Sequence, residues 1–395
     1  MNQSQRLHSL DNLRAVMMWL GIVLHAASNH MTQQSPMPWR DRETSLGADL
    51  IILFIHSFRM PVFFIVAGFF VALLVSRRGF AAMLKHRLRR IALPFAIFWP
   101  PLFAGTGALV LIYMHIMIRG SVGFDLALIS TKLPHQPLIN TLHLWFIYYL
   151  LWFCVLTTAF GLLSRHIPDA VRSACAGVWK ALASNWWGII VLTVPLATIG
   201  AFHEAGMLVP SGSFIPQFDE LVHNGLFFVF GWYLHRHQDM LLPLYSRNCW
   251  YYAAAGLLPF ILCLKFFDAF SANPGGIPYI AAYIAFAYNA TSWLWSLALI
   301  GLFFRYSSRQ NQVLKYFSES SYWAYLVHML GTIGFGALLY NLPFGALTKM
   351  SINIFATTLA CLATYHLLVR YTVIGVLLNG QRHSLKITGP SSVVA

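Results

Sequence analysis

The chain has 395 residues, of which 58% are hydrophobic and only 10% are charged, whereas soluble globular domains carry about 25% charged residues. The formal net charge is +14, but no polar domain exists to carry a basic patch, which excludes a nucleic-acid-binding protein. The five cysteines are spaced neither as zinc ligands nor as a disulfide framework, so a small metal- or disulfide-stabilised domain is excluded too.

Apolar segments recur along the chain, each near the length of about 20 residues that crosses a bilayer as a helix. They predict an all-α, polytopic transmembrane helical bundle with one membrane domain over 1–380 and a cytoplasmic tail over 381–395. The first segment is interpreted as an uncleaved span rather than a signal peptide, because it contains Arg14 and His25. Ten spans are predicted, with an eleventh left open within 203–235: 12–30, 49–75, 91–117, 142–163, 185–202, 221–235, 250–267, 280–304, 320–341 and 352–378.

The basic residues are distributed unevenly between the predicted loops. With the N-terminus placed in the cytoplasm, 17 Lys and Arg residues fall in inner segments and 5 in outer loops. This asymmetry predicts that both termini are cytoplasmic and explains most of the net charge. The expected location is the bacterial inner membrane, which the chain crosses many times.

The first predicted span carries ionisable side chains that are costly inside a bilayer. Arg14 lies near its cytosolic end, and His25 comes eleven residues later on the same helical face, roughly 16 Å further outward. Asp11 precedes Arg14 by three residues and can pair with it. The alternatives are an arginine that reaches the interface and an interfacial histidine.

The second predicted span contains His56 and Arg59, which are neighbours on one helical face. Pro61 comes next and frees a backbone carbonyl that must be satisfied by a cavity or another partner. Ala67 and Gly68 allow a neighbouring helix to approach closely. A structural kink with a paired arginine is the alternative to a functional site.

The inner loop after this span holds six basic residues within 77–90, among them Arg87, Arg89 and Arg90. Such a cluster suits phosphate binding, as on coenzyme A. Membrane orientation and contact with anionic lipids explain it equally well at this point.

Two further segments place aromatic and imidazole groups in or near the membrane. His143 and Trp145 begin the fourth span at the outer face, where an aromatic belt is the alternative interpretation. The ninth span contains Tyr322, Tyr325 and His328, and a hydrogen-bonded core histidine is the alternative for the last of these. Because no nucleophile elbow, P-loop or dinucleotide fingerprint occurs, a histidine is the best candidate base.

Four of these elements, in order, resemble motifs of the acyltransferase-3 family. They are Arg14 and His25 with ten residues between them, the run from Phe63 to Phe69 with Ala67 in place of the usual serine, the basic pair Arg89-Arg90 followed by Pro94, and the run from Ser321 to His328. The resemblance implies a membrane O-acyltransferase that carries an acyl group, succinyl in the subfamily most similar, from cytosolic succinyl-CoA or another acyl-CoA to hydroxyls of periplasmic glucans. It implies no metal and no tightly bound cofactor.

The resemblance also suggests roles for the singled-out residues. We expect Arg59, Arg87, Arg89 and Arg90 to bind acyl-CoA, with the pantetheine arm passing Arg14 towards His25. We expect His25 to act as general base or through an acyl-histidine, supported by Arg14 and Asp11. We also expect a substrate cavity, lined by His56, His143, Trp145, Tyr322, Tyr325 and His328. The alternatives are acyl transfer to another polysaccharide or O-antigen and, less favoured, a secondary transporter.

Overall fold

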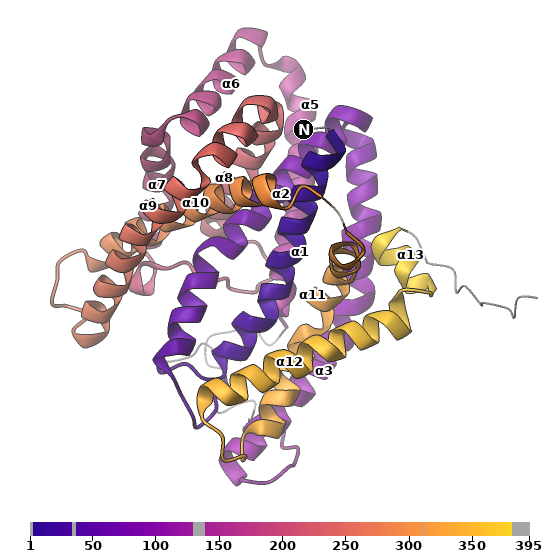
Figure 1. Ribbon diagram of the computed structural model, residues 1–395, viewed down its shortest axis with the longest axis vertical. Helices are drawn as coiled ribbons and strands as arrows, with labels where there is room; N and C mark the ends of the chain where they lie inside the picture. The colour runs from indigo at the N-terminus through magenta and orange to yellow at the C-terminus, as the bar shows by residue number, and fades with distance from the viewer. Residues whose placement is uncertain (1–2, 34–36, 129–138, 310, 381–395) are drawn as a thin grey trace, which may run out of the picture.

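The computed structural model describes residues 3–33, 37–128, 139–309 and 311–380, and within these ranges the regular structure is entirely helical, as predicted (Figure 1). The predicted tail 381–395 lies outside the described residues, as do the loop cations Lys132, Arg382 and Lys386. The α-helices are α1 (Gln3–Ser28), α2 (Leu46–Arg87), α3 (Leu93–Arg119), α5 (Trp145–Leu163), α6 (Asp169–Ser184), α7 (Trp186–Ala201), α8 (Phe218–Arg236), α9 (Gln238–Ala272), α10 (Ile280–Tyr306), α11 (Gln312–Leu339), α12 (Ala346–Thr364) and α13 (Val373–Asn379).

A helix occupies each of the ten predicted segments, but the count of ten crossings is not confirmed. Five helical stretches among the described residues are long and apolar enough to cross a membrane, and the bent pair α6 and α7 makes a sixth if it is one broken span. One reason for the difference is that the predicted spans 49–75 and 91–117 belong to a single helical stretch, Leu46–Arg119. The chain is a multi-pass membrane protein with a smaller number of clearly apolar helices than expected.

The chain departs from regular α-helix at two places on its way from α2 into α3, the first of them within α2 itself. Gly79 has a φ of 79°, a left-handed conformation that glycine adopts without steric cost. A π-helical turn, η1 (Leu88–Ala92), then leads into α3 and carries Arg89 and Arg90. The predicted basic loop is therefore helical, and its cations are held on a defined backbone rather than on a flexible connection.

Helices α2 and α8 cross at a contact between small residues. A side chain at Gly68 would collide with the backbone carbonyl of Phe228, and one at Gly231 would collide with the carbonyl of Ile65. This confirms that Gly68 permits close helix packing, as the sequence indicated. The crossing fixes α2, the helix that carries His56 and Arg59, against the centre of the bundle.

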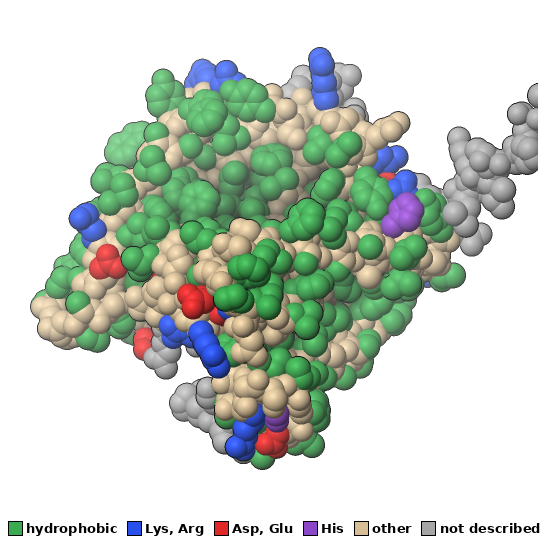
Figure 2. Space-filling view, turned by 60° about the horizontal axis from the view of Figure 1, so that its bottom comes forward, with side chains coloured by type: hydrophobic (Ala, Val, Ile, Leu, Met, Phe, Trp, Pro, Cys, Tyr) green, Lys and Arg blue, Asp and Glu red, His purple; other side chains and the backbone are tan. Residues whose placement is uncertain are grey.

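Large hydrophobic side chains remain exposed on many helices, as expected for a surface that faces lipid. They include Phe160, Trp250, Leu258, Phe355 and Leu367. In Figure 2 hydrophobic side chains are concentrated in the upper part of the face, whereas charged side chains lie at its edges and in its lower part. An apolar surface of this extent would be unfavourable in water, which supports the membrane assignment.

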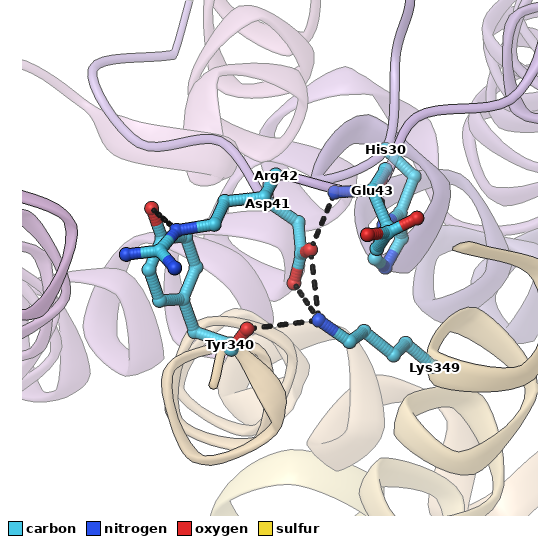
Figure 3. Close-up of polar contacts among 6 residues, drawn as sticks. All are labelled: His30, Asp41, Arg42, Glu43, Tyr340 and Lys349. Atoms are coloured by element: carbon cyan, nitrogen blue, oxygen red, sulfur yellow. Dashed lines mark hydrogen bonds and ion pairs between the residues drawn. The ribbon is translucent and has the colours of Figure 1, made fainter. Parts of the chain in front are cut away.

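A buried polar clasp ties the loop after α1 to the start of α12 (Figure 3). The Lys349 Nζ donates to the Asp41 carboxylate at 3.0 Å and to the Tyr340 carbonyl at 2.8 Å. Both charged side chains are 1% exposed, so this is a fully buried ion pair. Beside it, the Arg42 Nε donates to the Tyr340 hydroxyl at 3.0 Å. The clasp anchors the chain segment that comes directly after the last turn of α1.

Candidate active site

Five elements from distant parts of the sequence enclose one polar cavity of about 50 Å³. Such a volume holds roughly three or four water molecules. Seven residues singled out from the sequence lie together in its wall: His25, His56, Arg59, His143, Trp145, Tyr325 and His328; the other lining residues are Leu24, Met60, Phe63 and Phe146. Polar groups so enclosed are costly to bury, so their convergence indicates a functional site.

Two of the imidazoles are held by backbone carbonyls, which determines where their protons lie. The His328 Nδ1 lies 2.8 Å from the Tyr325 carbonyl and 3.0 Å from the Ala324 carbonyl. Since a carbonyl only accepts, Nδ1 carries the proton, and Nε2 is a bare acceptor that is buried without a partner among the described residues. His328 therefore presents a fixed lone pair rather than a donor.

His143 is also held by backbone carbonyls, but here Nε2 is the donor and Nδ1 is left without a proton. Its Nε2 donates to the carbonyls of Tyr325 and Leu326 at 3.0 and 3.1 Å, which leaves Nδ1 buried without a partner in the described part of the chain. The Tyr325 hydroxyl donates to the His143 carbonyl at 2.8 Å and closes the arrangement. The rings of His143 and His328 lie 5.0 Å apart and nearly perpendicular.

His25 lies in the last turn of α1 and faces this pair. Its ring centroid is 5.2 Å from that of His328, and its Nδ1 is buried with no partner among the described side chains and backbone groups. The Ser28 hydroxyl donates to the His25 carbonyl at 2.8 Å and helps to end the helix there. His143 and His328 are each fixed by backbone carbonyls, whereas no hydrogen bond within the described ranges fixes the rings of His25 and His56. Of the three rings that meet here, His25 is therefore the one best able to exchange a proton.

The Arg59 guanidinium is the positively charged group of the cavity, and it packs against α1. Its Nε donates to the Met17 carbonyl at 2.9 Å, and its guanidinium lies over the Phe63 ring at 5.7 Å. Gly21 makes the approach possible, because a side chain there would collide with the Arg59 guanidinium and come within 3.2 Å of the His328 Nε2. Sequence reasoning missed Gly21, although its place one turn before His25 was an available signal.

Six of the predicted site residues do not line this cavity: Asp11, Arg14, Arg87, Arg89, Arg90 and Tyr322. Asp11 and Arg14 form a partly exposed ion pair near the start of α1, with 3.3 Å between the Arg14 Nη2 and the Asp11 Oδ1. Arg89 is exposed, while the Arg90 Nη1 donates to the Val376 and Leu377 carbonyls at 2.7 and 3.1 Å. The Tyr322 hydroxyl points to the Arg90 carbonyl at 3.4 Å. We call this region, with Arg14 and 87–90, the basic end of the bundle.

Two guanidinium nitrogens at the basic end lack a hydrogen-bond partner in the part of the chain that the structure describes. The Nε atoms of Arg14 and Arg87 are both buried without a partner among the described residues, and the two guanidinium groups are close enough to repel each other. Two such donors suit a phosphate group, which accepts several hydrogen bonds from guanidinium groups. Between this end and the cavity, Leu13, Met17 and Phe63 are buried and packed, so the passage is closed in this conformation.

The described His, Cys, Asp and Glu side chains form no group of three placed to hold a metal ion. At the start of α2, the Asp49 carboxylate accepts from the backbone nitrogen of Thr32 at 3.1 Å. The lining of the cavity includes no carboxylate. Its chemistry therefore depends on imidazoles and one guanidinium.

Imidazole groups and a guanidinium that line one cavity of an apolar helical bundle suit the chemistry of a membrane acyltransferase. The sequence model of the acyltransferase-3 family, described as an acyltransferase domain, matches residues 7–366, and the chain belongs to this family. It is similar to the glucans biosynthesis protein C of Escherichia coli strain K12, with 26% identity over 359 residues that cover 85% of this chain and 84% of the relative. The protein of the same name from Escherichia coli O1:K1 is similar to the same extent. No solved structure matches the chain.

Proposed function

We propose that this protein transfers a succinyl group from cytosolic succinyl-CoA to hydroxyls of periplasmic glucans in the bacterial inner membrane. The family supplies the acyl-transfer chemistry. The relatives named for glucan biosynthesis support a glucan acceptor, and the motif resemblance supports succinyl as the acyl group. The observation that carries the proposal is the convergence of His25, His143, His328 and Arg59 on one enclosed cavity.

The reaction needs a base, a place for negative charge and a leaving group. His25 takes the proton of a sugar hydroxyl, whose oxygen attacks the thioester carbonyl carbon. The carbon–sulfur bond then breaks, and the coenzyme A thiolate leaves with the proton held on His25. Such base catalysis contributes about 10²–10⁴ in rate. In the other order, a His25 nitrogen attacks the thioester carbon and the coenzyme A thiolate leaves. The sugar hydroxyl then takes the acyl group from the acyl-histidine, and its proton goes to the imidazole that is released.

The geometry favours Arg59 over Arg14 as the group that meets the negative charge of the substrate. Arg59 lines the cavity with His25, whereas Arg14 lies at the basic end. A guanidinium binds a carboxylate through two parallel hydrogen bonds, which suits the free end of a succinyl group. The same group can stabilise the oxyanion that forms on the thioester carbonyl.

The acyl-CoA would enter at the basic end. Arg14 and Arg87, with their unpaired Nε atoms, are suited to the nucleotide phosphates, and Arg89 is exposed beside them. Arg90 is already bonded to the last turn of α13, so we assign it to holding that helix in place. The pantetheine arm reaches the cavity only if Met17 and Phe63 separate, and the proposal therefore includes an opening movement between α1 and α2.

The proposal is tested by mass spectrometry of periplasmic glucans from a strain that lacks the gene, complemented with the wild-type chain. We expect loss of the succinyl mass increment on deletion and its return on complementation. Glucans that keep full succinylation without the gene would contradict the proposal. A missing mass increment on a different polysaccharide, with unchanged glucans, would assign the enzyme to another acceptor.

A further inference from the structure

A second cavity, of about 40 Å³, adjoins the first and is not explained by the acyl donor. His56, Met60 and Trp145 line both cavities, so the two share one wall. The remaining lining of the second comes from α2, the end of α7, the segment between α7 and α8, and helices α8 and α10: Pro61, Gly200, Leu208, Pro210, His223, Asn224, Tyr288, Asn289 and Ser292. The polar residues of this cavity beyond the shared wall carry no motif in the sequence.

One polar group of this cavity, the His223 imidazole, is placed to receive a hydrogen bond from a ligand. The His223 Nε2 lies 3.0 Å from the Asn289 Oδ1, which only accepts, so Nε2 carries the proton. The His223 Nδ1 is then a bare acceptor, buried and without a partner among the described residues. The Asn289 amide donates to the Ala285 carbonyl at 2.9 Å, which holds it in this orientation. A ligand hydroxyl can satisfy the Nδ1 lone pair.

The lining contains no Lys, Arg, Asp or Glu. It therefore has no group to neutralise a carboxylate or a phosphate, and an ionic ligand would bear the full cost of leaving water. A neutral ligand rich in hydroxyls meets no such cost, because amide, hydroxyl and imidazole groups exchange hydrogen bonds with it. The rings of Trp145 and Tyr288 add flat apolar surface suited to the carbon face of a sugar ring.

We propose that the second cavity is the acceptor subsite, which binds the hydroxyl-bearing edge of one neutral sugar residue beside His56 and Trp145. This inference rests on the proposed function and adds the groups that select the acceptor. The charge of the lining assigns each substrate to one cavity. Arg59 lies in the cavity for the acyl donor, and neutral groups line the cavity for the sugar. The rest of the glucan would extend past Leu208 and Pro210, which lie outside the helices.

The test uses purified full-length protein in lipid vesicles, with a short neutral glucose oligosaccharide and succinyl-CoA as substrates. His223→Phe and Asn289→Leu remove the polar groups and keep similar side-chain volumes. His115→Phe on α3 and Asn248→Leu on α9 are matched controls, since neither residue lines either cavity. The measurements are KM for each substrate and direct binding of the oligosaccharide by calorimetry without acyl-CoA.

We expect each cavity variant to raise the KM for the oligosaccharide by about tenfold or more, the effect of losing one or two hydrogen bonds. The KM for succinyl-CoA should change less than about twofold, as should both constants in the controls. An unchanged oligosaccharide KM, or an equal rise in both KM values, would overturn the inference. A variant that fails to fold is detected by loss of succinyl-CoA binding, and His223→Gln then serves as the milder substitute with the same expectation.

Failure of the proposed function gives a different pattern. If the wild-type protein transfers no succinyl group but binds the oligosaccharide, and the two cavity variants abolish that binding, the subsite stands and the proposed reaction does not. If the wild-type protein is active and both variants keep wild-type oligosaccharide binding, the subsite is wrong and the reaction stands.

Discussion

At the scale of single residues, the site depends on which nitrogen atoms carry protons. His143 and His328 each donate one N–H to backbone carbonyls, so each keeps a bare nitrogen buried in the bundle. Arg59 supplies the only charge among the residues that line the cavity. Small changes near these groups should therefore affect catalysis more than stability.

Gly21→Ala is predicted to lower kcat by about a hundredfold, because its methyl group displaces the Arg59 guanidinium and approaches His328, and small misplacements of reacting groups have effects of this size. Stability should change little, since the displaced group is the end of a flexible side chain. The measurement is steady-state kinetics with a thermal melt in detergent. Gly107→Ala on α3, where nothing lies within 4 Å, is the matched control, and an active Gly21→Ala enzyme would contradict the prediction.

Arg59→Met is predicted to remove the preference for a donor with a free carboxylate. The ratio of kcat/KM for succinyl-CoA over acetyl-CoA should fall by roughly 10–100-fold, the value of a hydrogen bond to a charged group. Arg59→Lys keeps the charge but loses the fork geometry and should recover only part of this ratio. A ratio unchanged in Arg59→Met would assign Arg59 to the oxyanion or to packing instead.

At the scale of elements, the position of His25 depends on the loop between α1 and α2. The Asn29 side chain donates to the Thr332 carbonyl at 3.3 Å, and Trp39 donates to Asn29 at 2.9 Å. The Asp41–Lys349 clasp then fixes the same loop to α12. These bonds join α1 to α11 and α12 at the level where α1 ends, so they hold His25 towards His328.

Lys349→Met is predicted to lower the free energy of unfolding by about 3–5 kcal/mol, because it leaves the Asp41 carboxylate buried and unpaired. The double variant Asp41→Leu, Lys349→Met removes both charges and should recover most of this loss. The free energies of unfolding of the single and the double variant are measured by denaturation in detergent, with tryptophan fluorescence as the signal. A double variant as unstable as the single one would show that the clasp contributes net stability of its own.

Sequence patterns predict which residues belong to the first cavity, but they do not predict which residues contact one another in space. Intramembrane His and Arg are unusual enough to mark His25, Arg59 and His328 individually. By contrast, the second cavity combines His223 of α8 with Asn289 of α10, and periodicity gives the face of a helix but not its partner.

Two elements of the fold show the same limit. The segment of α6 falls between two of the predicted spans, and the structure has a helix there. Arg90 has the sequence context of a phosphate ligand, yet its side chain bonds to the end of α13. That bond depends on how α13 packs against η1, and a sequence pattern contains no information about this packing.

At the scale of the whole molecule, the proposed reaction requires the basic end to face the cytoplasm. Arg14 and 87–90 lie there, whereas the second cavity lies beside the segment between α7 and α8. A donor from one side and an acceptor from the other would then meet near Trp145, which borders both cavities. The orientation of the bundle in the membrane therefore decides whether both substrates can reach their cavities.

Reporter fusions test the orientation. A fluorescent protein that folds only in the cytoplasm should be bright when fused after Ala395, and alkaline phosphatase inserted at Gly275 should be active in the periplasm. The C-terminal alkaline phosphatase fusion is the control and should be inactive. The reverse pattern would place the basic end outside and separate Arg87 from cytosolic acyl-CoA.

In the proposed reaction, the imidazole of His25 carries the proton during acyl transfer. The most direct test is single-turnover succinyl transfer by purified His25→Gln protein in lipid vesicles, compared with wild type and with His115→Gln as a matched control. We predict that His25→Gln slows transfer by about 10²–10⁴, with abundance, melting temperature and succinyl-CoA binding unchanged. Transfer by His25→Gln within about tenfold of the wild-type rate would contradict this role for His25.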